Sequence, residues 1–277
     1  RVFLRQGVTI LAGVSFAGSA MGAVRRNEYE VNHITIPIAS LPAEFDGFTI
    51  CLLSDIHSSV FMPKETMKRY AHAANALRTD MIAVVGDFVN SHVDEVYPFA
   101  EAFSELRAPY GVYGVLGNHD YYSRDVETVA RIVDECGIRL LVNSKLTIEK
   151  NSKKLHLLGA HDIGNSVKAS RAFDSMLKGV DASSPKVLLC HRPYFFQEAA
   201  DRHIGLTLSG HTHGGQIVFA KVGKEIVSFA RVASPYVAGL YSINSSHMYV
   251  SRGIGTVGVP VRINCPPELT KITLTKV

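Results

Sequence analysis

Polar side chains follow five short apolar runs at the point where each run ends, and this pattern restricts the possible folds of the chain more than any other feature. The runs alternate with segments of helical periodicity, which predicts right-handed βαβ units and a largely parallel sheet. The side chains that follow the runs are, in order, Asp55 and His57, Asp87, Asn118 and His119, His191, and His211 with His213. Because ligands in open α/β sheets bind at the carboxyl ends of the strands, we expect these side chains to lie together.

The apolar runs and periodic segments predict an α/β protein. The predicted strands cover 48–53, 81–85, 111–116, 146–149, 155–159, 187–190, 206–208, 216–219, 247–250 and 269–274. The predicted helices cover 64–78, 94–106, 124–136 and 169–178. No internal repeat or low-complexity linker divides the chain, so we predict one catalytic domain, residues 27–277, behind an N-terminal segment, residues 1–26.

The donor types at the strand ends point to a metal site. All of them are oxygen or imidazole donors without a thiolate, which suits Mn, Fe or Zn better than a soft metal. Asp55 and His57 are two residues apart, and in an extended segment such residues point to one side, so both are expected to face one ion. The same holds for His211 and His213. Nearby glycines, at 86, 117 and 210, allow the tight turns that a compact site needs.

The charge distribution argues against a nucleic-acid binder that works through a basic face. The formal net charge is +4, and the first 26 residues contain four arginines and no acidic residue. The rest of the chain therefore carries equal numbers of basic and acidic residues. The four cysteines are widely spread without CxxC or zinc-finger spacing, which argues against a disulfide scaffold.

The N-terminal segment has the features of a targeting signal. Residues 7–24 form an 18-residue run without charge, at the lower limit for a membrane-spanning helix. Residues 1–5, Arg-Val-Phe-Leu-Arg, resemble the second half of a twin-arginine export signal. We therefore expect a signal cleaved near residues 20–23 or an uncleaved membrane anchor, with the catalytic domain in the cell envelope on the extracytoplasmic side. An ordinary amphipathic or buried helix is the alternative.

The motifs taken together resemble the signature of the calcineurin-like metallophosphoesterase superfamily. They are Asp55-Ile56-His57, Gly86-Asp87, Gly117-Asn118-His119-Asp120, His191 and Gly210-His211-Thr212-His213. The run 210–217 and the tail 252–268 also resemble the bacterial envelope branch of that family. The resemblance implies a four-layer α/β/β/α sandwich with a binuclear metal centre.

The same resemblance assigns roles to the motif residues. The implied ligands are Asp55, His57 and His213 for the first ion, Asn118, His191 and His211 for the second, and Asp87 as the bridge between them. His119 is implied as the general acid for the leaving oxygen or as a phosphate contact. The implied reaction is hydrolysis of phosphomonoesters or phosphodiesters by in-line attack of a metal-activated water.

One position departs from the pattern of many relatives, which carry an aspartate three residues after the bridging aspartate to pair with the catalytic histidine. Asn90 stands there, and an amide can orient an imidazole but cannot stabilise its charge. Asp120 either compensates for this change or has a purely structural role. Tyr121 and Arg192 are candidate substrate and phosphate contacts, with local packing as the alternative for each.

Two other functions stay open. A lipid pyrophosphatase acting on a substrate such as UDP-2,3-diacylglucosamine would suit an envelope location, although no obvious hydrophobic lid insertion lies between the motifs. A non-catalytic metal-binding scaffold usually lacks several ligands, and here all are present. The expected partners are thus a small-molecule or lipid-linked phosphoester and, through the N-terminal segment, a membrane. Ligand types alone leave the metal, the natural substrate and the oligomeric state open.

Overall fold

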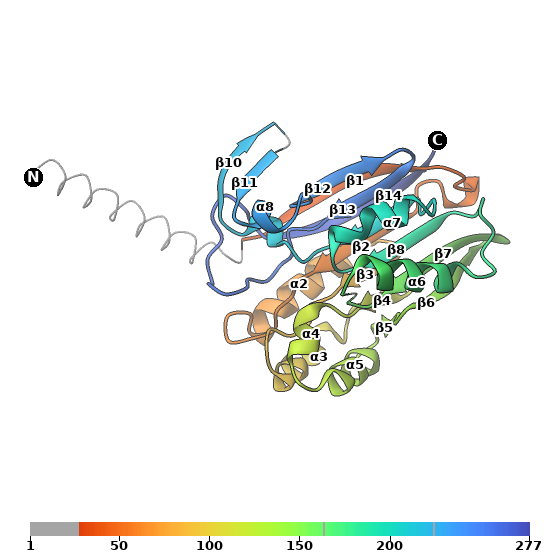
Figure 1. Cartoon of the computed structure of the whole chain (residues 1–277). Coiled ribbons are helices and arrows are strands. Elements are labelled where there is room, and N and C mark those ends of the chain that lie inside the picture. Colours follow the sequence, from red (N-terminus) through yellow and green to blue (C-terminus); the bar gives the residue numbers. More distant parts are fainter. Residues whose placement is uncertain (1–27, 163, 224) are drawn as a thin grey trace, which may run out of the picture.

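Two six-stranded sheets form the centre of the protein, whose computed structural model describes residues 28–162, 164–223 and 225–277 (Figure 1). The first sheet has the order β1 (Glu30–Ile38), β14 (Glu268–Lys276), β2 (Thr49–Ser54), β3 (Met81–Val85), β4 (Val112–Val115) and β5 (Arg139–Leu140). The second has the order β12 (Gly239–Ile243), β13 (Ser246–Val250), β9 (Leu206–Ser209), β8 (Lys186–Cys190), β7 (Lys153–Ala160) and β6 (Ser144–Lys150).

Most neighbouring strands are parallel, as predicted. In the first sheet only the β14–β2 pair is antiparallel. In the second sheet the antiparallel pairs are at the two edges, β12–β13 and β6–β7. Parallel neighbours place the carboxyl ends of β2, β3 and β4, and likewise those of β8 and β9, on one side of each sheet.

Helices cover the outer face of each sheet, which completes four layers. The helices α2 (Lys64–Ala76), α3 (Val96–Phe103) and α5 (Val126–Glu135) pack on the first sheet. The helices α6 (Ser166–Leu177) and α7 (Phe196–Ala200) pack on the second. Figure 1 shows α2, α3 and α5 together at the bottom of the view, apart from α6 and α7, which lie in front of the strands. The predicted α/β/β/α sandwich is confirmed.

The strand sequences explain why the sheets are buried on both faces. In β2, Ile50 and Leu52 point into the core between the sheets, whereas Cys51 and Leu53 point toward the helices. This alternation follows from the two-residue repeat of a strand, and it requires an apolar residue at every position. A Leu52→Ala substitution would remove fully buried methyl groups and cost about 2–5 kcal/mol of stability.

Several elements differ from the predicted ones. The helix predicted over 94–106 is a 3₁₀ turn, Val93–Glu95, followed by α3. The strand predicted over 216–219 begins at Val218, and no strand was predicted for β1, β5 or β12. A hairpin of β10 (Val218–Val222) and β11 (Glu225–Ser228), followed by the short α8 (Ala230–Ala233), projects from one end of the molecule (Figure 1).

The predicted N-terminal targeting segment, residues 1–26, lies outside the described residues. Both the targeting signal and the domain boundary after it therefore stay predictions. Within the described part of the chain, none of the helices has the length and apolar character needed to span a membrane.

Candidate metal centre

The predicted ligand side chains come from strand ends of both sheets. Asp55 and His57 follow β2, Asp87 follows β3, and Asn118 begins the short helix α4 (Asn118–Tyr122) directly after β4. From the second sheet, His191 follows β8, and the remaining two histidines follow β9. The centre therefore lies where the carboxyl ends of the two sheets meet.

One group of potential ligand atoms belongs to Asp55, His57, Asp87 and His213, and these atoms lie within 4.8 Å of one another. The Nε2 atoms of His57 and His213 are 3.0 Å apart. Nε2 of His57 is 3.4 Å from Oδ2 of Asp87, and Nε2 of His213 is 3.6 Å from Oδ1 of Asp55. All four side chains are buried.

A second group consists of Asp87, His191 and His211. Nε2 of His191 is 3.2 Å from Oδ2 of Asp87, the same oxygen that approaches His57. Asp87 is thus common to both groups and lies between them. This is the position that the bridging ligand of a binuclear centre must take, because two nearby cations need an anion between them.

The backbone at the ligands is left-handed. Asp55, His57, Asp87, His211 and His213 have φ angles of 52°, 49°, 55°, 73° and 53°. The expectation that each i, i+2 pair lies in an extended segment is therefore wrong, and turns bring the side chains together instead. For residues other than glycine the left-handed conformation costs about 1–2 kcal/mol each. Such strain concentrates at functional sites and is offset by the surrounding structure.

Close approach of the strand ends explains two of the glycines. A Cβ atom at Gly210 would collide with Oδ2 of Asp55, and one at Gly117 would collide with the carboxylate of Asp87. Both glycines thus leave room for the carboxylates of the candidate ligands.

Several buried polar atoms of the centre have no hydrogen-bond partner. They are Oδ2 of Asp55, Nδ1 of His57, Oδ1 of Asn118, Nε2 of His191 and Nδ1 of His213. Leaving a buried polar group unsatisfied costs about 1–3 kcal/mol, so such a concentration calls for a bound group. Carboxylate, amide and imidazole donors are a set that suits divalent cations, so the residues fit the metals that the sequence predicts.

Burial and the Asp87 carboxylate set the protonation of the imidazoles. Burial lowers the pKa of His57 and of His211 to about 3 each, which keeps these imidazoles neutral and able to donate a lone pair. For His191 burial acts in the same direction, but the Asp87 carboxylate outweighs it and raises the pKa to about 10. A proton on His191 therefore competes with a cation for this position.

Other contacts orient His191. Its Nδ1 donates to the backbone carbonyl of Val85 at 2.9 Å, which turns Nε2 toward Asp87. A second hydrogen bond of this kind is usual for histidines that bind metals, because it fixes both the tautomer and the ring orientation.

His119 lies beside the centre without belonging to either ligand group. Its backbone N–H donates to Oδ1 of Asp87 at 2.8 Å, and its ring contacts the ring of His57 edge-on. Its Nδ1 donates to the backbone carbonyl of Asn90 at 2.5 Å, whereas the amide of Asn90 donates to Ser91. Asn90 thus orients the imidazole of His119 through its main-chain carbonyl, not through its amide side chain.

Asp120 has a structural place. The side chain is fully buried and accepts hydrogen bonds from the backbone N–H groups of Asp87, Phe88, Val89 and Gly117. These bonds fix the turn that carries the bridging carboxylate. The structure gives Asp120 no hydrogen bond to the imidazole of His119, so the structural alternative is favoured over compensation for Asn90.

Tyr121 and Arg192 both pair with the loop after β7. The hydroxyl of Tyr121 lies 2.8 Å from Nδ1 of His161. The guanidinium of Arg192 forms a bidentate ion pair with Asp162, at 2.5 Å and 3.1 Å. The ion pair with Asp162 leaves Nη1 of Arg192 without a bond to that carboxylate, so a contact between Arg192 and a phosphate stays a prediction, as does one between Tyr121 and substrate.

Arg262 supports the centre from behind and was not singled out from the sequence. The side chain is only 4% exposed, and its guanidinium donates to backbone carbonyls that include those of His213 and Gly255. Gly255 in turn donates to the carbonyl of Asp55 at 2.7 Å. Arg262 thereby connects the turns that carry two ligands of the first group. An arginine between Val261 and Ile263 was the available signal, because a charge in an apolar run is unusual.

Comparisons with known proteins agree with this geometry. A family model described as calcineurin-like phosphoesterase matches residues 48–215. A transmembrane protein with metallophosphoesterase domain from Danio rerio is 31% identical over 259 residues, which cover 88% of this chain and 57% of that protein. The uncharacterized metallophosphoesterase YkuE of Bacillus subtilis is 29% identical over 275 residues, which cover 96% of this chain and 93% of that protein.

The chain therefore spans little more than half the length of the vertebrate relative, although it spans most of the bacterial one. Among solved structures, the protein TT1561 of Thermus thermophilus aligns with a TM-score of 0.50 at 15% identity, over 75% of this chain and 90% of that protein. At this identity the likeness supports the fold alone.

Proposed function

Since this chain belongs to the calcineurin-like phosphoesterase family, we propose that it hydrolyses phosphomonoesters or phosphodiesters with the help of two divalent cations. Asp55, His57 and His213 would hold one cation, and Asn118, His191 and His211 the other. The shared carboxylate of Asp87 would bridge them. Manganese is our first candidate, and iron and zinc suit the same donors.

One observation carries the proposal. Oδ2 of Asp87 lies 3.4 Å from Nε2 of His57 and 3.2 Å from Nε2 of His191, so one oxygen faces both ligand groups. A mononuclear site needs no such shared anion. The arrangement therefore favours a pair of cations over a single one.

The side chains of the centre and His119 would have different roles in hydrolysis. When bound, the cations would offset the charge of the phosphate and lower the pKa of a water molecule toward neutrality. The left-handed turns hold the carboxylates and imidazoles in place before substrate arrives, so little reorganisation is needed. His119 donates through Nδ1 to Asn90, which leaves Nε2 as the atom that can hold a proton for the leaving oxygen.

A direct assay tests this function. Chelator-treated protein should not hydrolyse bis-p-nitrophenyl phosphate or p-nitrophenyl phosphate, and Mn²⁺ should restore hydrolysis of at least one of them. The Asp87→Asn variant, nearly equal in size, should stay inactive with Mn²⁺. Equal hydrolysis with and without Mn²⁺ would contradict the proposal, as would full activity of the variant.

A lipid-linked pyrophosphate, as in UDP-2,3-diacylglucosamine, is a second candidate substrate. The observation in its favour is an apolar cavity that borders His211 and His213. Detergent-dependent hydrolysis of such a substrate would support it. A non-catalytic scaffold gains no support, because the side chains at six of the seven ligand positions converge, those of Asp55, His57, Asp87, His191, His211 and His213.

We further propose that the chain belongs to the bacterial envelope branch and that its catalytic domain lies on the extracytoplasmic side. The support is the sequence of residues 1–26, with its arginine-flanked uncharged run and its likeness to a twin-arginine signal. The same segment would be its contact with a membrane.

The location is tested with a reporter that must fold before export, fused to residues 1–26 and to whatever precedes Arg1 in the gene. Replacement of Arg1, together with any arginine that directly precedes it, by lysine should trap the fusion in the cytoplasm. Equal export of the lysine variant would contradict the twin-arginine route.

A further inference from the structure

A cavity of about 310 Å³ lies directly beside the metal centre. Two candidate ligands, His211 and His213, form part of its wall, and the rest includes Ile217, Phe229, Ala230 and Ala233. The volume is at the lower end of the range for small-molecule sites, about 300–1,000 Å³. We infer that this cavity binds an apolar ester group attached to the phosphate of the substrate.

Three polar side chains of the wall, those of Thr212, Gln216 and Ser234, already form hydrogen bonds within the protein. Thr212 donates to the carbonyl of Val237 at 2.6 Å, and Ser234 donates to that of Tyr236 at 2.9 Å. The amide of Gln216 makes three hydrogen bonds to the main chain of Val257 and Val259. These groups therefore offer a ligand little hydrogen bonding, and the wall behaves as apolar surface.

The wall is also neutral. Among the described residues that line the cavity there is no lysine, arginine, aspartate or glutamate. A charged or strongly hydrated alcohol would lose its hydrogen bonds to water in the cavity without gaining partners, whereas an alkyl chain has no such hydrogen bonds to lose.

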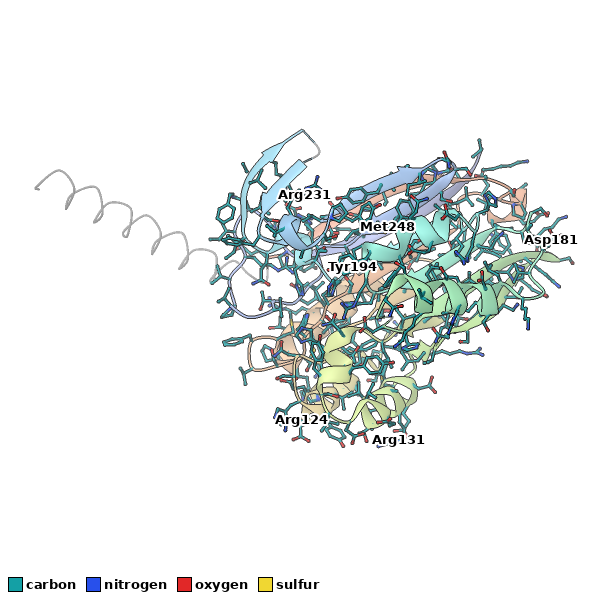
Figure 2. The ribbon with its side chains drawn as sticks, in the orientation of Figure 1. Arg124, Arg131, Asp181, Tyr194, Arg231 and Met248 are labelled. Atoms are coloured by element: carbon teal, nitrogen blue, oxygen red, sulfur yellow. The ribbon has the colours of Figure 1, made fainter. Side chains whose placement is uncertain are left out.

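Exposed aromatic side chains continue the apolar surface outward. Phe229 is 72% exposed, and its ring meets that of Phe219 edge-on with centroids 5.1 Å apart. Figure 2 shows Tyr194, another wall residue, near the centre of the view and Arg231, on α8, closer to the projecting hairpin. An exposed apolar patch at the mouth of a cavity is typical of a binding site.

The shared histidines connect the cavity to the chemistry. A phosphate bound at the cations that His211 and His213 would help to hold would have its ester group next to the cavity wall, because the same two side chains line both regions. This assignment rests on the proposed function, and it narrows the substrate to a phosphoester with at least one apolar substituent.

Binding of two phosphonates to the Mn²⁺-loaded full chain tests the assignment without requiring turnover. Hexylphosphonate and methylphosphonate have the same charged head and differ only in the apolar chain. Isothermal titration calorimetry should give a dissociation constant at least about tenfold lower for hexylphosphonate, since each buried methylene strengthens binding. Ala233 is exposed at the cavity, so both Ala233→Asp and Ala233→Leu should fold; the charge of aspartate should abolish this preference, whereas the apolar leucine should keep it.

The neighbouring Val232, 92% exposed and outside the wall, provides the matched control. Val232→Asp adds the same charge one residue away and should keep the preference for hexylphosphonate. Equal affinities of the wild-type protein for the two phosphonates would overturn the assignment, as would the same loss in Val232→Asp and Ala233→Asp. If hexylphosphonate is preferred but neither bis-p-nitrophenyl phosphate nor p-nitrophenyl phosphate is hydrolysed with Mn²⁺, the cavity assignment holds and the proposed function fails.

Discussion

The metal centre and the apolar cavity share His211 and His213 but have opposite properties. In the centre, buried nitrogen and oxygen atoms lack hydrogen-bond partners, so the site is suited to cations. In the cavity, the side chains of Thr212 and Ser234 bond to the main chain and no charged residue lines the wall, so the surface is suited to an apolar group. The two regions would therefore act separately: the centre would set the rate for every phosphoester, and the cavity would set which ester is preferred.

The largest effect is expected at the residue common to both ligand groups. Asp87→Ala removes the only anion between them, so both cations should be lost. Loss of a general acid typically reduces the rate by roughly 10²–10⁴-fold, and Asp87→Ala should reduce activity toward all esters by more than this. Elemental analysis measures the metal content. Two tightly held metals in the variant would show that Asp87 is not the bridge.

Removal of His119 should separate metal binding from catalysis. His119→Ala should keep both metals and reduce turnover by about 10²–10⁴-fold for esters with poor leaving groups. The loss should be smaller for p-nitrophenyl esters, because p-nitrophenolate leaves without a proton. Steady-state kinetics on phenyl and p-nitrophenyl esters provides the comparison. Equal losses for both would instead indicate that His119 binds phosphate.

Arg262 contacts the main chain of His213, one of the two histidines that both regions share, and its substitution should have an effect of intermediate size. Arg262→Lys leaves some carbonyls of the ligand turns without donors, so Mn²⁺ affinity of the first group should fall about 10–100-fold. Titration with Mn²⁺, alongside thermal unfolding, measures this. Arg202→Lys, in an ion pair with Asp174 near the surface, is the matched control and should bind metal normally. A drop in thermal stability with unchanged Mn²⁺ affinity would give Arg262 a structural role only.

The smallest effect is expected at position 90. The main-chain carbonyl orients His119, so Asn90→Ala keeps the hydrogen bond and should change turnover by less than about threefold, as for an ordinary surface substitution. Steady-state kinetics of the variant decides the matter. A loss as large as that of His119→Ala would mean that the amide side chain takes part after all.

The same contrast explains what the sequence could predict. Asp55, His57, Asp87 and the later histidines are polar residues directly after buried strands, so their place at the strand ends follows from the pattern alone. The left-handed backbone conformation of these residues does not follow from the pattern, because the type of side chain does not determine the conformation of the turn. The partner of His119 is a main-chain group, which no residue code reveals.

The cavity was beyond prediction for a different reason. Its wall combines the turn after β9, the residues of α8 and the distant Val257, which meet only in the folded chain. The sequence has no obvious apolar insertion between the motifs, and the structure places the hairpin and α8 after the last of them. Three-dimensional neighbours, rather than residue types, define this region.

The most direct test of the binuclear centre is anomalous diffraction from crystals of the Mn²⁺-loaded protein. Two peaks are expected, one among Asp55, His57 and His213 and the other among Asn118, His191 and His211. Both should lie within coordination distance of the Asp87 carboxylate. A single peak, or two peaks of which only one contacts Asp87, would contradict the account.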